Sequence, residues 1–142
     1  MDESALGPEK GPLLRAKLHI RGGKRRLKQG KISAGIITLY DALSAAMEWY
    51  VAANERRVNL QVREGENLND DRTLFNVLTR SGILDKKFDY EAFDKLVEKA
   101  SDEEMPQYDY SKLLEGIESL MTRLGVVPFD ERELPPEDPS TF

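Results

Sequence analysis

The chain has 142 residues, of which 39% are hydrophobic and 33% are charged, and its formal net charge is −5. This length and balance predict one water-soluble domain with a core of its own. The absence of cysteine excludes disulfides, thiolate zinc sites and a cysteine nucleophile, and the single histidine, His19, excludes sites built on two imidazoles. No apolar run approaches the ~18 residues of a membrane span, and the N-terminus lacks the apolar stretch of a secretory signal. We therefore expect a cytoplasmic protein without membrane partners.

The charges are unevenly distributed along the chain. The first 40 residues hold nine Lys/Arg against three Asp/Glu, and the rest holds twelve against twenty-three. No acidic residue lies between Glu9 and Asp41. This asymmetry predicts either an anion-binding face or a charge match, within the chain or between two chains.

Residues 13–54 predict two helices that pack as an antiparallel hairpin. Pro12 fits the first turn of the first helix, Gly30 fits its end, and Gly22-Gly23 lies either at the contact with the second helix or at a break. We favour the contact. The apolar residues of each segment recur at alternating steps of three and four: Leu13, Ala16, Ile20, Gly23 and Leu27, then Ile32, Ile36, Leu39, Leu43, Ala46 and Tyr50.

The remaining chain predicts three shorter helices after an ambiguous stretch. Residues 57–63 alternate in polarity, which is typical of a short extended piece or of a fraying helix end. The first later helix is expected to begin at Asp70 or Asp71 and to end at Gly82. The next begins at Asp89, and the last begins at Asp109 and ends at Gly125. The fold class predicted is therefore all-α, a bundle of four to five helices built on the N-terminal hairpin.

The chain is predicted to form one helical domain over residues 1–129, in which residues 1–11 are flexible. Residues 130–142 combine three prolines with several acids and predict a mobile tail without regular structure.

The most prominent functional candidate is a run of cations: Arg21, Lys24, Arg25, Arg26, Lys28 and Lys31. Such a run can bind phosphate, because each Lys or Arg that contacts phosphate adds salt-dependent affinity. It can equally be a solvated face whose charges offset the negative end of a helix. No aromatic residue that could stack on a base lies before Ile37.

A second candidate is aromatic. Tyr40, Trp49 and Tyr50 could line a ligand pocket, although aromatic residues at helical spacing more often belong to a core. No residue has the surroundings of a catalytic group, and we expect neither a metal site nor a cofactor.

Residues 16–51 resemble the helical hairpin of HEPN-type domains, which have a first helix, a short glycine-containing turn, and a second helix with a tyrosine and small residues. The matching positions are Leu27, Gly30, Lys31, Ala34, Tyr40, Ala42 and Ala46. The resemblance implies an all-α bundle that often dimerises, and many members work beside nucleotidyltransferases or act as ribonucleases. The ribonuclease members carry Arg-x4–6-His on a late helix, and this chain has no histidine after His19. The resemblance therefore implies a non-catalytic relative.

These observations leave two predictions of function. The first is a non-enzymatic helical interaction module that binds another protein or a second copy of itself. The alternative is an accessory protein that binds nucleic acid or nucleotides with the basic N-terminal face.

Overall fold

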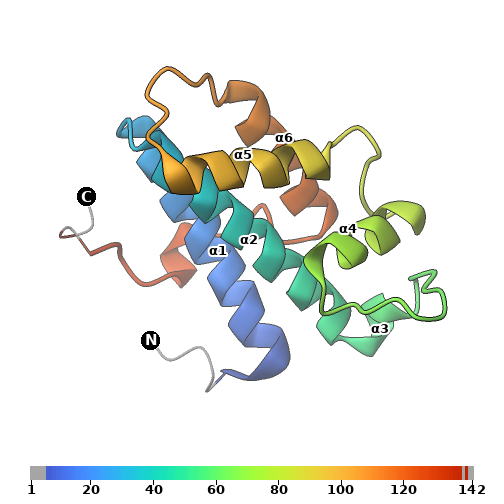
Figure 1. Cartoon of the computed structure of the whole chain (residues 1–142). Helices are drawn as coiled ribbons and strands as arrows, with labels where there is room; N and C mark the ends of the chain where they lie inside the picture. Colours follow the sequence, from blue (N-terminus) through green and yellow to red (C-terminus); the bar gives the residue numbers. More distant parts are fainter. Residues whose placement is uncertain (1–5, 139, 141–142) are drawn as a thin grey trace.

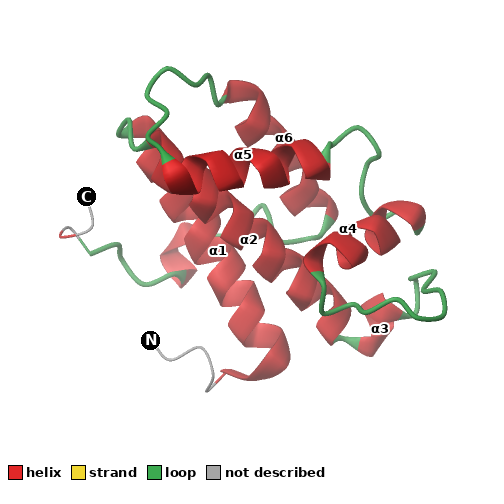
Figure 2. Cartoon of the chain, in the orientation of Figure 1, coloured by secondary structure: helices red, strands yellow, loops and turns green. Residues whose placement is uncertain are grey.

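The structure, a computed structural model, describes residues 6–138 and 140 and is helical throughout its regular part (Figure 1). Within these residues no strand is present, as Figure 2 shows, and the predicted all-α bundle is confirmed. None of the described helices is long and apolar enough to cross a membrane. The elements are α1 (Gly7–Lys28), α2 (Ile32–Ala52), α3 (Asn54–Arg57), α4 (Asp71–Arg80), α5 (Tyr90–Asp102), α6 (Ser111–Arg123) and the 3-10 turn η2 (Glu131–Glu133).

Helix α2 is the centre of the bundle. It packs along α1 and also contacts α3, α4, α5 and α6, and Figure 1 shows α5 crossing over it. Most of its residues are buried, which requires the small and aliphatic side chains that its sequence supplies on more than one face. Ile36, Leu39 and Leu43 are at most 1% exposed and lie in the single core.

The hairpin forms as predicted, with Gly22 and Gly23 inside an unbroken α1 and buried. A Cβ added at Gly23 would lie 2.9 Å from Cδ2 of Leu39, so the glycine marks a close approach of the two helices. At the turn, Gly30 has φ +80° and Lys31 N donates to Arg26 O at 2.9 Å. This left-handed residue closes the last turn of α1 and allows α2 to return antiparallel.

The first helix begins earlier than the sequence predicts. It starts at Gly7, with a proline in its first turn, so that Pro12 lies inside the helix rather than near its start. Pro8 accounts for this difference, because its fixed φ suits the first turn and initiates the helix ahead of Pro12. Residues 1–11 were expected to be flexible; the segment is helical from Gly7, and residues 1–5 lie outside the described part.

The later helices follow their predicted caps closely. The Asp70 carboxylate accepts from Thr73 N at the start of α4, and the Asp89 carboxylate accepts from Ala92 N at the start of α5, both at 3.0 Å. The cap of the last helix is one residue later than predicted: the N-cap of α6 is Tyr110, and Asp109 accepts from the backbone N–H of Ser111 without capping the helix.

The ambiguous stretch at residues 57–63 is neither a strand nor a continuation of α2. After α3 the chain becomes a turn and an irregular loop, in which Val58 is 78% exposed and Val62 is 45% exposed. An alternation of polarity without a partner strand therefore gives no sheet here.

Candidate functional site

Four of the six predicted cations lie on one face of α1. Arg21, Lys24, Arg25 and Lys28 follow at steps of three, one and three, which places them on one side of a helix. Together with Gln29 and Glu131 they line a hollow of about 310 Å³, which we call the basic hollow.

The other two predicted cations lie elsewhere. The Arg26 side chain turns toward α2, where its Nη1 donates to Thr38 Oγ1 at 3.0 Å. Lys31 is exposed in the turn after α1. The sequence thus identified the run of charge, but only the 3.6-residue period of the helix separates the members that share a face.

The C-terminal segment contacts this face of α1 through side chains of the helix. Figure 1 shows η2 beside α1, with the chain then running outward toward the C-terminus. The Asp130 carboxylate accepts from Arg132 N at 2.9 Å and starts η2, after which Leu134 is buried at 7% exposure. Arg21 Nη2 donates to the carbonyl oxygen of Pro135 at 2.9 Å. Within residues 130–138 the tail buries Leu134 and gives α1 an acceptor, and its mobility stays a prediction.

The carboxylate of Glu137 joins two of the arginines of α1, Arg21 and Arg25. Arg25 Nε donates to Glu137 Oε2, and Arg21 Nε lies 3.8 Å from Glu137 Oε1. The side chains are 14% exposed for Arg25, 15% for Arg21 and 22% for Glu137, so this cluster is largely shielded from solvent. Shielding of this kind weakens the screening by salt that makes exposed ion pairs weak.

Arg21 keeps one unsatisfied donor. Its Nε atom is buried and has no hydrogen-bond acceptor among the described residues, since the distance to Glu137 is too long for a hydrogen bond. A buried donor without an acceptor is unfavourable, and an anion placed closer than Glu137 would satisfy it.

Further acids pair with the same side of α1. Lys24 Nζ lies 3.5 Å from Glu118 Oε1 of α6, and Lys17 Nζ lies 3.9 Å from Glu133 Oε2 of η2. The basic first part of the chain is thus matched by acids from its last part. Of the charged groups that line the basic hollow, Lys28 forms no ion pair within residues 6–138 and 140.

The acids at the two ends of the tail segment remain ionised well below neutral pH. Hydrogen bonds from the side chain and N–H of Arg132 hold the pKa of Asp130 below its usual value. The backbone N–H and hydroxyl of Ser140 do the same for the pKa of Asp138. The segment therefore presents α1 with an anionic peptide over the physiological pH range.

The three aromatic candidates do not form one pocket in the described part of the chain. Tyr40 and Trp49 are nine residues apart on α2, which separates them by about 13 Å along the helix axis. The Trp49 ring lies 3.9 Å from the guanidinium carbon of Arg56, and Tyr50 is buried in the core at 7% exposure. Trp49 and Tyr50 therefore have structural surroundings.

Tyr40 does border a hollow of about 410 Å³, whose wall holds Tyr90 and several acids. The Tyr90 hydroxyl donates to the Tyr40 oxygen at 3.3 Å, and burial raises the pKa of Tyr90 far above its usual value. The acids already have partners: Asp71 accepts from Ser44, Asp94 pairs with Arg72, and Asp70 caps α4. Their hydrogen bonds hold the helices in place and leave no carboxylate directed at a ligand.

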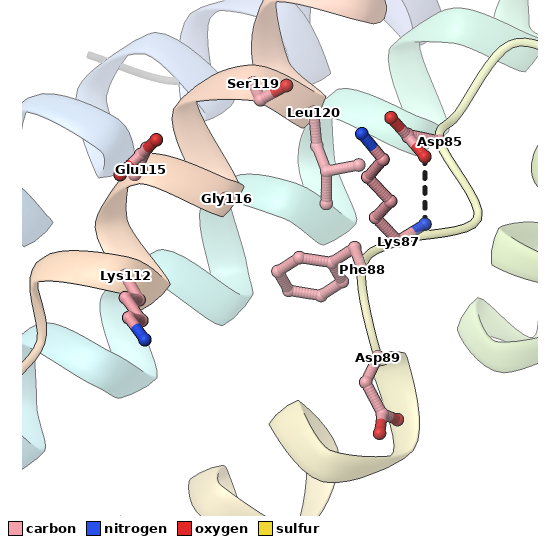
Figure 3. Close-up of a pocket in the computed structure, with 9 residues that line it drawn as sticks. All are labelled: Asp85, Lys87, Phe88, Asp89, Lys112, Glu115, Gly116, Ser119 and Leu120. Carbon is pink, nitrogen blue, oxygen red and sulfur yellow. Dashed lines mark hydrogen bonds between the residues drawn. The ribbon is translucent and has the colours of Figure 1, made fainter.

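A larger hollow of about 550 Å³ lies between α6 and the loop before α5, and the sequence did not predict it (Figure 3). Its floor is made by Phe88 against Gly116, where a Cβ would lie 3.1 Å from the Phe88 ring. The signal in the sequence was a glycine in the middle of a helix. Figure 3 shows charged side chains of both signs around the ring, with Asp85 accepting from Lys87 N at 2.9 Å. Their mixed signs favour no single class of ligand.

No group of three or more potential metal ligands occurs among the described residues. Comparisons of the chain with protein-family models, with curated proteins and with solved structures find no match. The resemblance to the HEPN hairpin therefore stays a prediction, and function has to be argued from the site.

Proposed function

We propose that this chain is a non-enzymatic interaction module whose α1 face binds an acidic, proline-containing segment of a protein. The observation that carries the proposal is the chain's own segment on that face. Leu134 is buried, Arg21 donates to the Pro135 carbonyl, and Glu137 meets Arg21 and Arg25.

These contacts supply the elements of peptide recognition. A hydrogen bond to a backbone carbonyl fixes the position of the bound peptide. Two guanidinium groups around one position favour an acidic residue there, and a buried aliphatic side chain adds apolar contact area. The tail occupies this face as a resident ligand, and an incoming segment from a partner protein or from a second copy of the chain has to displace it. Because the tail is joined to the rest of the chain by a short tether, its effective concentration at this face is on the order of millimolar. A partner segment therefore displaces the tail only if it binds the face more tightly.

A fluorescent peptide of residues 128–140 tests the proposal. The full chain with Leu134→Ala and Glu137→Gln, whose own tail is weakened, should bind this peptide saturably in an anisotropy titration. The unchanged chain should bind it about tenfold more weakly, because its tail competes. Adding Arg21→Gln and Arg25→Gln to the released chain should abolish binding.

The matched control is the released chain with Lys10→Gln and Lys31→Gln. This variant loses the same charge from exposed positions outside the basic hollow, and it should bind as the released chain does. No binding by the released chain, or an equal loss in both charge variants, would contradict the proposal.

One observation favours the second function, an accessory protein for nucleic acid. Four cations line the basic hollow, and each can contact a phosphate. Labelled single-stranded RNA and duplex DNA should then bind with an affinity that falls steeply between low and moderate salt. The same Arg21 and Arg25 substitutions should abolish this binding, whereas no binding at low salt would remove this function.

A further inference from the structure

The basic hollow stays open while the tail is in place. Its volume of about 310 Å³ is bordered by Arg21, Lys24, Arg25 and Lys28, and Glu131 is the one carboxylate in its wall. Within residues 6–138 and 140 no ion pair joins Glu131 to these four cations, although Glu133 and Glu137 both pair with α1. The tail therefore places the Glu131 carboxylate in the wall of the hollow, but this carboxylate does not neutralise the cations there.

We propose that the basic hollow is a phosphate subsite, which takes the phosphorylated serine or threonine of an acidic partner segment at the place where Glu131 lies. This inference rests on the proposed function and names the chemistry of its partner. A phosphate monoester has nearly two negative charges and three acceptor oxygens, whereas a carboxylate has one charge and two oxygens. It matches a wall of four cations better than Glu131 does.

The donors in the wall suit phosphate. Guanidinium groups form paired hydrogen bonds to phosphate oxygens, and lysines add point charges from flexible stems. Lys28 is exposed at the end of α1 and can reach over the hollow without giving up a partner among the described residues. Arg21 adds a buried Nε that lacks an acceptor.

The C-terminal end of α1 has a partial negative charge, which disfavours an anion in the basic hollow. Hydrogen bonds at this end of the helix reduce the effect. The carbonyls of Arg25, Arg26 and Leu27 accept hydrogen bonds from the N–H groups of residues 29–31. Since these carbonyls accept hydrogen bonds, the partial charge that the helix end presents to the hollow is small beside the full charge of Lys28, which has no ion pair among the described residues.

A peptide suits the face better than a nucleic acid does. The hollow adjoins a track where Arg21 donates to a peptide carbonyl and Leu134 is buried. A nucleic acid has no aliphatic side chain to take the place of Leu134, and no aromatic side chain on which a base could stack lines the hollow.

The test uses three peptides of residues 128–140: the unmodified one, one with serine in place of Glu131, and one with phosphoserine at that position. Each is titrated by anisotropy into the full chain with Leu134→Ala and Glu137→Gln. The phosphoserine peptide should bind about tenfold more tightly than the serine peptide. Adding Lys28→Gln should reduce this gain to about threefold or less, and adding Lys31→Gln, an exposed lysine outside the hollow, should leave it unchanged.

A second measurement separates a phosphate site from general charge attraction. The 31P titration of the bound phosphoserine peptide should show a lowered phosphate pKa, because the cations stabilise the dianion, and Lys28→Gln should raise this pKa again. The melting temperatures of the lysine variants show that both are folded.

The outcomes separate the two proposals. If the unmodified peptide binds and phosphate adds nothing, or adds as much in Lys28→Gln as in Lys31→Gln, the subsite is overturned and the interaction module stands. If none of the peptides binds, both proposals fail. If labelled RNA competes with the phosphoserine peptide and depends on Lys28, the hollow is a nucleic-acid site and the peptide subsite is overturned.

Discussion

Replacing Gly35 by alanine should destabilise the protein although alanine is the better helix former. A Cβ at Gly35 would lie 2.6 Å from Cδ2 and 2.7 Å from Cγ of Leu27, and 3.2 Å from its backbone nitrogen. Leu27 is 2% exposed, so its side chain has no free space into which to move, and a rotamer change cannot relieve the backbone contact. Overpacking of this kind costs ~1–3 kcal/mol, and alanine regains about 1 kcal/mol of helix propensity. Because the contact includes a backbone atom, we expect a cost in the upper part of this range, about 2–3 kcal/mol, and so a net loss of about 1–2 kcal/mol.

The matched variant is Gly22→Ala in the facing helix. There the new Cβ would meet only the flexible end of Arg26, at 3.3 Å, and Thr38 Cγ2 at 4.0 Å. This variant should be as stable as the unchanged chain, or more stable by up to about 1 kcal/mol. Urea unfolding measures both free energies, and thermal melting should place Gly35→Ala about 3–7 °C lower. Equal stability of the two variants would refute the close approach of α1 and α2 at this point.

Two further predictions concern pH and capping. Hydrogen bonds from the Arg80 side chain and from the Arg63 N–H hold the pKa of Glu66 at about 2, so its stabilising effect should be complete above pH 4.5 and lost as the pH falls toward 2. An NMR titration of the carboxyl group should give that midpoint, and Arg80→Gln should move it up toward 4.5; an unchanged midpoint would contradict the assignment. Asp89→Ala removes the acceptor for Ala92 N and should cost about 1 kcal/mol in urea unfolding, whereas Lys95→Ala on the exposed side of the same helix should change stability by less than about 0.5 kcal/mol.

The parts of the fold that the sequence predicts are those determined by local chemistry. Asp70 and Asp89 cap their helices because a carboxylate one residue ahead of a helix satisfies a free N–H, and this depends on few residues. The alternating apolar steps of α1 and α2 predict their contact for the same reason. The start of α1 was misplaced because two prolines, Pro8 and Pro12, both suit a first turn, and the helix begins at the first of them.

The candidate site depended on contacts that local patterns do not contain. Arg21 and Glu137 are 116 positions apart, and their meeting depends on the path of the chain after α6. The run from Arg21 to Lys31 indicated charge but not partners. In the structure these cations divide: Arg26 donates to Thr38 of α2, whereas Arg21 and Arg25 contact the tail. The sequence did not predict the hollow beside Phe88. A glycine in a helix, here Gly116, indicates that another group lies close to the backbone but does not indicate which group.

The proposed function treats the tail as a ligand that a partner can replace, and this requires the tail to be held weakly. Leu134 is the one large apolar side chain that residues 130–138 bury, and its burial stabilises docking by about 1.5–3 kcal/mol. The contacts of Glu137 with Arg21 and Arg25 add to this, and another acidic segment can reproduce them. On the proposed function, a partner that matches these pairs and adds charge at the basic hollow should bind the same face more tightly than the tail does, because the tail leaves Lys28 without an ion-pair partner among the residues described.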